Sequence, residues 1–203
     1  FVFDPLTDSI GAAPKFRLGL SVAALTEDLA KLGLRLILRR GEALAVLRDL
    51  VAQTGAGAVY WSRLYDPEAK SRDIDVKAGL KADGLEVKSF AGHLLFEPWT
   101  VETKTGGFYK VFTPMWKTVR SRELPACLPA PSAVQGPEVW PVSDDLDDWQ
   151  MGAAMRRGAA VLRPYCTVGQ DAAQARLKVF LEDRVGDYRE NRDLPSVDGT
   201  SRL

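Results

Sequence analysis

The residues with the clearest chemical potential stand together in the closing stretch DGTSRL, residues 198–203. An Asp-Gly pair is typical of a turn, and Thr200 and Ser201 are of the types that cap the N-terminus of an α-helix. Arg202 places a permanent positive charge beside the two hydroxyls. The sequence therefore predicts that a helix begins at these residues, and a plain N-cap is the simplest interpretation of Thr200 and Ser201.

The other reactive side chains form no recognisable catalytic motif. His93 is the only histidine, and a single histidine after a strand more often has a structural than a catalytic role. The sequence contains no nucleophile motif, Walker loop, zinc-ligand spacing or complete GxGxxG pattern. Residue types alone favour an α/β domain whose ligand crevice lies at the carboxyl ends of its strands.

The composition excludes several classes of protein. The 27 basic and 27 acidic side chains cancel, so no net charge directs the chain toward nucleic acid or an anionic membrane. No apolar run approaches the roughly 18 residues that a membrane span needs. Cys127 and Cys166 lack metal-ligand spacing, so we expect reduced thiols in a cytoplasmic protein without a metal site.

Short β-rich apolar runs alternate with amphipathic helical patterns over the first 90 residues. Such alternation over short connections is typical of a parallel sheet with helices on both faces. The predicted strands cover residues 1–3, 34–38, 57–61 and 85–90, and the predicted helices cover 14–32, 42–54 and 68–82. The predicted fold class is therefore α/β, with a doubly wound, Rossmann-like parallel sheet.

The alternation ends after residue 91. Residues 99–112 carry two β-rich arms around a Thr-Gly-Gly turn, which predicts a β-hairpin. Thr113 and Pro114 have the residue types of an N-cap and a first helical position, so we expect a short helix there. The stretch YKVFTPMWK mixes aromatic residues with lysines, but we interpret it as a structural element and not as a nucleic-acid platform.

The second half of the sequence predicts a linker and then a new helix. Residues 125–170 are rich in Pro, Gly, Ser and Asp, which is typical of a long connection, held here by Trp140 and Trp149. A helix is expected from Asp171, and its apolar stripe runs through Ala173, Leu177, Phe180, Leu181 and Tyr188. The predicted domains are an α/β domain (1–124), an interdomain linker (125–170) and the start of an all-α domain (171–203).

Four stretches resemble the DNA photolyase/cryptochrome family in sequence and in order. They are VFDP, LRLILRRGEALAVLRDLVAQTGAGAVYWSRLYDPEAKSRD, YKVFTPMWK and ARLKVFLEDRVGDYRENRDLPSVDGTSRL. The most specific parts are YKVFTP (109–114) and the closing Tyr-x-x-x-Arg-Asp-x-Pro…Thr-Ser-Arg-Leu. The resemblance covers nearly the whole chain, and it implies that residues 1–124 form the light-harvesting, or antenna, domain of a bacterial-type photolyase.

The resemblance implies FAD as a cofactor. In this family the Thr-Ser-Arg-Leu stretch opens a helix and contacts the phosphates and ribityl chain of FAD, so the expected FAD-binding residues are Thr200, Ser201, Arg202 and Leu203. Free N–H groups and the positive end of a helix dipole favour a pyrophosphate. Tyr188 would lie against the flavin nucleotide, and its alternative role is that of a core aromatic residue.

The resemblance also implies an antenna chromophore, which in the family is a deazaflavin, a folate or flavin mononucleotide (FMN). Phe3, Asp4 and Pro5 match the loop that contacts deazaflavin-type chromophores. Lys70 stands where it could meet an acidic group of the chromophore. The ordinary interpretation of these residues is a strand end, a turn and a solvated lysine.

One known mode of folate binding is not expected. Some folate-binding relatives use an Asn-Glu pair in the helix that follows the Tyr-Asp dipeptide. The corresponding positions here are Glu68 and Ala69, so the carboxylate that would pair with the amino group of a pterin is absent.

The activity implied for the full-length protein is light-dependent DNA repair by a deoxyribodipyrimidine photolyase, a carbon–carbon lyase. Photoexcited reduced FAD would transfer an electron to a cyclobutane pyrimidine dimer and split it. Damaged DNA would bind to a helical domain, so no catalytic residue is expected in these 203 residues. The full-length protein is expected to be a monomer. The family's first, central strand has no counterpart here, so a sheet formed from these residues would lack its middle.

Two other functions are compatible with the same residues. A cryptochrome-like blue-light photoreceptor would have the same fold and flavin but a signalling output. An unrelated α/β nucleotide-binding module would have no light chemistry.

Overall fold

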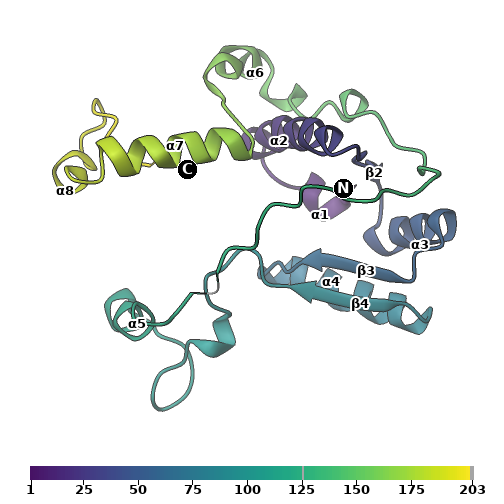
Figure 1. Ribbon diagram of the computed structural model, residues 1–203, viewed down its shortest axis with the longest axis horizontal. Coiled ribbons are helices and arrows are strands. Elements are labelled where there is room, and N and C mark those ends of the chain that lie inside the picture. The colour runs from purple at the N-terminus through teal and green to yellow at the C-terminus, as the bar shows by residue number, and fades with distance from the viewer. Residues whose placement is uncertain (125, 202–203) are drawn as a thin grey trace.

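The structure is a computed structural model of the chain, and it describes residues 1–124 and 126–201. Within these ranges four strands form two separate parallel pairs (Figure 1). The first pair is β1 (Val2–Phe3) with β2 (Arg39–Arg40), and the second is β3 (Ala58–Ser62) with β4 (Glu86–Phe90). The predicted class, α/β with parallel strands and flanking helices, is confirmed. The described strands nevertheless divide into two pairs and do not form one continuous sheet.

Asp-Pro dipeptides start two of the helices that flank the strands. Asp4 and Asp66 each accept a hydrogen bond from a backbone N–H three residues later, that of Thr7 at 2.8 Å and that of Ala69 at 3.0 Å. Proline then occupies the first helical position, where no backbone donor is needed. The helices are α1 (Pro5–Asp8), α2 (Ala12–Lys31), α3 (Ala43–Thr54) and α4 (Pro67–Ala82). The last three confirm the predicted helices, whereas α1 was not predicted.

The predicted strand over residues 34–38 is wrong. The β2 ladder covers only Arg39–Arg40, and before it the Ile37 carbonyl accepts from the N-terminal amino group of Phe1 at 2.6 Å. The opposite edge of this segment pairs with a distant part of the chain. The Leu38 N–H donates to Ser143 Oγ at 2.9 Å, and the Leu38 carbonyl accepts from the Asp144 N–H at 2.8 Å. A segment more than a hundred residues away thus replaces a neighbouring strand.

The predicted hairpin over residues 99–112 is also wrong. The segment contains a single 3-10 turn, η1 (Pro98–Thr100), followed by a tight turn in which the Thr103 N–H donates to the Gly107 carbonyl at 2.9 Å. Gly106 and Gly107 both have a φ of 83°, so two consecutive left-handed residues coil the chain.

α5 (Phe112–Val119) confirms the predicted short helix but not its cap. The N-cap position is Val111, so Thr113 and Pro114 lie inside the first turn. Proline is tolerated there because the first N–H groups of a helix have no intrahelical partner. Figure 1 shows α5 at the lower left, at a distance from the strands.

The predicted linker is anchored to the first strand pair. Trp149 is 8% exposed, and its indole stacks on the Phe3 ring with 5.0 Å between centroids. Trp140 is half-buried. The short helices of this region are η2 (Asp147–Trp149), η3 (Ala153–Met155), α6 (Arg157–Leu162) and η4 (Arg163–Tyr165).

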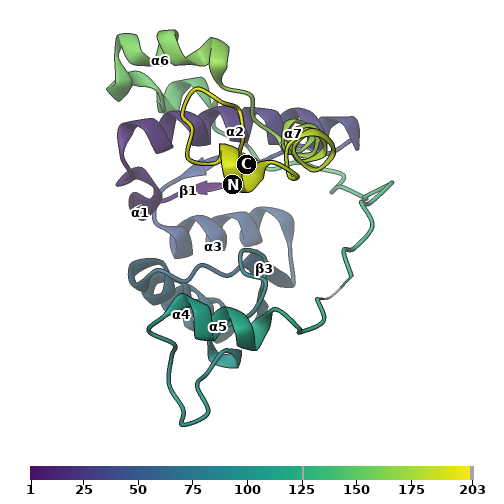
Figure 2. The same cartoon turned by 90° about the vertical axis from the view of Figure 1, so that its left-hand side faces the viewer.

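α7 (Gln170–Asp183) confirms the helix expected near Asp171, but the helix ends before the predicted apolar stripe does. Tyr188 instead begins α8 (Tyr188–Asn191), and its ring meets Phe180 edge to face at 5.8 Å. The N-terminal part of α7 lies beside α2 (Figure 2). Among the residues described, no helix is long and apolar enough to cross a membrane.

Two apolar cores correspond to the two strand pairs. The core of the first pair consists of Phe3, Val22, Leu38, Trp149 and Met151. The core of the second pair consists of Val76, Leu80 and Val87, with Leu44, Leu47, Val59 and Trp61 packed against them. Trp149 and Met151 are therefore the residues by which the linker completes the core of the first strand pair.

We predict that Trp149→Ala in the full-length protein lowers the free energy of unfolding by about 3–5 kcal/mol, because it leaves a cavity against Phe3. Denaturant unfolding monitored by circular dichroism would measure this. Trp116→Ala is a suitable control, since Trp116 is 47% exposed, and it should cost clearly less. Equal losses for the two variants would contradict the anchoring role of Trp149.

Candidate functional site

Asp4 is a buried carboxylate at the carboxyl end of β1. Asp4 is 3% exposed. Its side chain caps the N-terminus of α1 and also accepts a hydrogen bond from Arg72 Nη1 at 2.7 Å. Burial alone would raise the pKa of Asp4, but the hydrogen bonds from Thr7 and the Arg72 guanidinium together hold that pKa below its ordinary value. Asp4 is therefore a carboxylate anion, and both of its oxygens already accept hydrogen bonds from within the protein.

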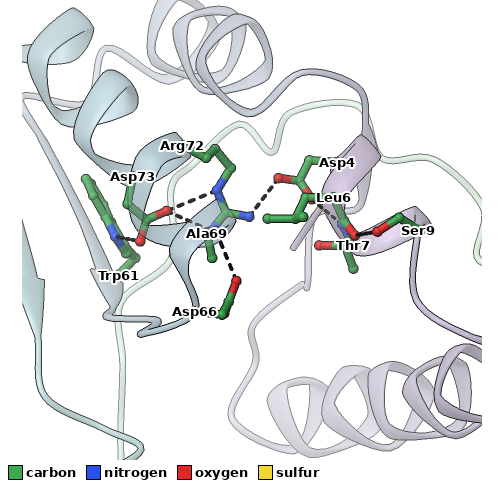
Figure 3. A network of polar contacts seen from close by, with 9 residues as sticks. All are labelled: Asp4, Leu6, Thr7, Ser9, Trp61, Asp66, Ala69, Arg72 and Asp73. Atoms are coloured by element: carbon green, nitrogen blue, oxygen red, sulfur yellow. Dashed lines mark hydrogen bonds and ion pairs between the residues drawn. The ribbon is translucent and has the colours of Figure 1, made fainter.

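Arg72 connects the two strand pairs through Asp4 and Asp73 (Figure 3). Its Nη2 lies 2.7 Å from Asp73 Oδ1, and Asp73 Oδ2 accepts from Trp61 Nε1 at 2.9 Å. Burial lowers the pKa of Arg72, but hydrogen bonds to Asp73 and Asp4 more than offset this, and the net pKa lies above its ordinary value. The network runs from β3 through α4 to β1.

A first pocket of about 400 Å³ lies beside the three predicted antenna residues Phe3, Asp4 and Pro5. Asp8 and Arg40 also line it, and they form an ion pair with a distance of 2.6 Å. Phe3 is 1% exposed, so its ring belongs to the core. The structure thus brings these three predicted residues together, in a pocket whose polar groups largely bond to one another.

Lys70, the fourth predicted antenna residue, lines a different pocket. This second pocket, also about 400 Å³, lies at the carboxyl ends of β3 and β4, against α4. We call it the tryptophan pocket, and we define it by Trp61, Arg63, Tyr65, Lys70, Lys77 and Trp99. Sequence reasoning missed its aromatic residues, although two of them stand in or just after a predicted strand.

Ala69, where the folate-binding relatives are expected to carry a carboxylate, lies in the first turn of α4. It is 1% exposed, and its N–H donates to the Asp66 cap. A buried methyl group at this position cannot pair with a pterin amino group.

The predicted FAD-binding residues Thr200 and Ser201 lie in an irregular segment held by Arg176. Arg176 Nε donates to the Ser201 carbonyl at 2.7 Å, and Nη2 donates to the Thr200 carbonyl at 2.7 Å. Arg176 also forms a bidentate pair with Asp198, and the hydrogen bonds that Arg176 donates to this carboxylate raise the pKa of Arg176. Arg184 binds Asp198 as well. The two carbonyls are therefore turned toward α7.

Arg202 and Leu203, and with them most of the helix predicted to begin at Thr200, lie outside the described residues. Tyr188 is 39% exposed, and one face of its ring is contacted by Arg192, 6.0 Å from the centroid. A Cβ placed on Gly199 would lie 2.5 Å from Asn191 Cβ, so the segment that contains Thr200 packs against the end of α8. The structure thus places α8, which begins with Tyr188, next to this segment.

These features define a class of protein: a Rossmann-like α/β domain with ligand-sized pockets at the carboxyl ends of its strands, followed by a helical segment. The chain belongs to the DNA photolyase family, because the family model described as DNA photolyase matches residues 1–134. The resemblance seen in the sequence is thereby confirmed.

Relatives are found among both photolyases and cryptochromes. The chain is 38% identical over 195 residues to deoxyribodipyrimidine photo-lyase of Agrobacterium fabrum, covering 96% of this chain and 41% of the relative. It is 32% identical over 190 residues to cryptochrome-1 of Arabidopsis thaliana, covering 90% of this chain and 27% of the relative. The chain thus spans less than half of the length of these relatives.

A solved structure shows the same fold. The crystal structure of a bacterial class III photolyase from Agrobacterium tumefaciens superposes with a TM-score of 0.92 at 36% identity. The superposition covers 100% of this chain and 42% of that one. The arrangement of strands and helices described above is therefore that of a photolyase N-terminal region.

We predict that Asp4→Asn in the full-length protein lowers stability by about 1.5–3 kcal/mol at pH 7, since it removes a charge-assisted hydrogen bond. The pKa of Asp4 is depressed in the folded state, so its stabilisation is present above the unfolded pKa of about 3.9 and is lost as the pH falls through the folded value. The difference between variant and wild type should therefore shrink below about pH 4.

Thermal or denaturant unfolding at pH 7, 5 and 3 would measure this difference. Asp148→Asn serves as the control, because Asp148 is exposed and its replacement should change little at any pH. A loss of stability for Asp4→Asn that is the same at pH 7 and pH 3 would show that the carboxylate charge has no part in the network.

Proposed function

We propose that the full-length protein is a deoxyribodipyrimidine photolyase that repairs cyclobutane pyrimidine dimers in light, and that this chain supplies its light-harvesting domain. The observation that carries the proposal is the relation to the Agrobacterium photolyases, at 38% identity over 96% of the chain and a TM-score of 0.92. The proposed domains are those expected from the sequence: an antenna domain over 1–124, a linker over 125–170 and the start of a helical FAD domain over 171–203.

FAD is the proposed redox cofactor, and when bound it supplies the electron that splits the dimer. The Thr200–Ser201 segment fits a pyrophosphate, because Arg176 holds its carbonyls and leaves its N–H groups and hydroxyls for a ligand. Neither hydroxyl forms a hydrogen bond with the rest of the described chain. Thr200, Ser201, Arg202, Leu203 and Tyr188 are the proposed FAD-binding residues of this chain.

An antenna chromophore is the second proposed cofactor, and its class is a deazaflavin, a folate or FMN. The proposed contacts are Phe3, Asp4, Pro5 and Lys70. Because these residues line two separate pockets, a single chromophore would be held by one group or the other.

Damaged DNA is the proposed partner, and photolyases bind it by flipping the damaged base out of the helix. We propose a monomer that acts in the cytoplasm. The free thiols of Cys127 and Cys166 fit a reducing compartment.

A second candidate function is that of a cryptochrome-like photoreceptor with a signalling output. The 32% identity to cryptochrome-1 over 90% of the chain favours it. The two functions differ in one measurable property, which is repair.

Repair of an oligonucleotide that contains a pyrimidine dimer tests the proposal. We expect the full-length, FAD-loaded protein to remove dimers under blue light and not in darkness, with the products separated by chromatography. If dimer loss in the light equals that in the dark, the photolyase proposal fails and the photoreceptor is favoured.

We predict that Gly199→Ala lowers FAD occupancy of the full-length protein at limiting FAD. The new Cβ would lie 2.8 Å from the Asn191 carbonyl oxygen, so the Thr200–Ser201 segment must move away from the phosphates. Losing one charge-assisted hydrogen bond corresponds to a roughly ten- to hundredfold weaker affinity.

Flavin absorbance after gel filtration would measure the occupancy. Gly186→Ala is the matched control, since a Cβ there meets no atom of the described residues within 4 Å. Equal occupancy in both variants would place the flavin phosphates away from this segment.

A further inference from the structure

Two arginines at α7 converge on the carboxylate of Asp198. Arg176 lies within the helix, and Arg184 follows its last residue. Arg176 forms a bidentate pair with Asp198, and Arg184 Nη2 lies 3.2 Å from Asp198 Oδ2. We call these three residues the Asp198 clamp. Because two guanidinium groups share one carboxylate, the clamp carries a net positive charge.

The clamp arginines also bind the backbone of residues 198–201. Arg176 donates to the carbonyls of Thr200 and Ser201, each at 2.7 Å. Arg184 Nη1 donates to the carbonyl of Asp198. The carbonyls of these three residues therefore face the arginines. Since a carbonyl oxygen repels an anion, turning these carbonyls toward the arginines leaves the opposite side of the segment more favourable for a phosphate.

The planarity of the peptide bond determines where the Ser201 N–H points. In a trans peptide the N–H of a residue points opposite to the carbonyl of the residue before it. The Thr200 carbonyl faces Arg176, so the Ser201 N–H points away from the clamp. Neither this N–H nor the hydroxyls of Thr200 and Ser201 have a hydrogen-bond partner among the residues that the structure describes. The segment thus offers three unpaired donors to an anion.

Stability alone does not account for the position of Arg184. Its Nε is buried and has no hydrogen-bond partner within the described ranges. A buried donor without a partner lowers the stability of the folded protein, and such a group in a native structure calls for an explanation. Arg184 nevertheless keeps its other two nitrogens on Asp198. A role in holding the segment for a ligand supplies that explanation.

We propose that Arg176, Arg184 and Asp198 are positioning residues for the binding of the FAD phosphates. They act through the segment: they hold its carbonyls, so that the Ser201 N–H and the hydroxyls of Thr200 and Ser201 are presented to the pyrophosphate. The inference rests on the proposed function for the identity of the cofactor. It extends the site to two arginines and a carboxylate that the sequence motifs did not single out.

Titration of FAD and of riboflavin into the FAD-free full-length protein, followed by flavin fluorescence, tests the proposal. Riboflavin has the same ring and ribityl chain but no phosphate. Arg176→Gln should weaken FAD binding roughly ten- to a hundredfold and riboflavin binding by no more than about threefold, because the clamp acts on the phosphate-binding groups. A general loss of stability would weaken the binding of both ligands and leave the ratio of their affinities unchanged.

Asp198→Asn separates positioning from simple charge attraction. The substitution removes a negative charge near the phosphates, so charge attraction alone predicts tighter FAD binding. Positioning predicts the opposite, a roughly tenfold weaker affinity for FAD, because the arginines lose the carboxylate that fixes them. Arg176→Lys gives an independent test, since lysine keeps the charge but lacks the planar group that binds in several directions. It should bind FAD as weakly as Arg176→Gln does.

Lys178→Gln is the matched control, because Lys178 is a cation of the same helix with a side chain that is 72% exposed, and its loss should leave both affinities unchanged. Circular dichroism would confirm that each variant is folded. The proposal is overturned if Asp198→Asn tightens FAD binding, if Arg176→Lys restores it, or if riboflavin binding weakens as much as FAD binding. Any of these results in a protein that repairs dimers refutes the clamp alone. The expected affinities in a protein without repair refute the photolyase function alone.

Discussion

The contact on which the rest of the structure depends is the ion pair between Arg72 and Asp4. Each strand pair is too small to be stable alone, and no ladder joins them in the ranges described. Arg72 reaches from α4 to the end of β1, where the Asp4 side chain is 4% exposed. Removing two charges from water is costly, and here several hydrogen bonds offset that cost.

The same network also holds one wall of the tryptophan pocket. Asp73 holds both Arg72 and Trp61, so the wall of the tryptophan pocket and the bridge between the strand pairs share one carboxylate. Arg176 has an equivalent role at the other end of the chain, where it fixes a segment through Asp198 and two carbonyls. In both places one guanidinium donates several hydrogen bonds at once. It thereby fixes side chains and carbonyls that no helix or strand hydrogen bond holds.

The elements that sequence reasoning predicted well depend on local signals. The helices follow from apolar periodicity and from end signals such as Asp66-Pro67 and Gly55, and β3 and β4 follow from compact β-rich runs. The failures at residues 34–38 and 99–112 have a different origin. Whether a β-rich run joins a ladder depends on which distant segment pairs with it, and no local pattern contains that information.

For the site, the sequence by itself determined the family, the candidate residues around Asp4 and Thr200, and the position of Lys70 at the start of a helix. Only the tertiary structure decided that Lys70 and Asp4 line different pockets, and that Trp99 joins Trp61. The physical reason is that motifs report short-range order along the chain, whereas a pocket is formed by side chains brought together through packing and buried ion pairs. Sequence motifs therefore identified candidate residues, and packing decided which of them line the same pocket.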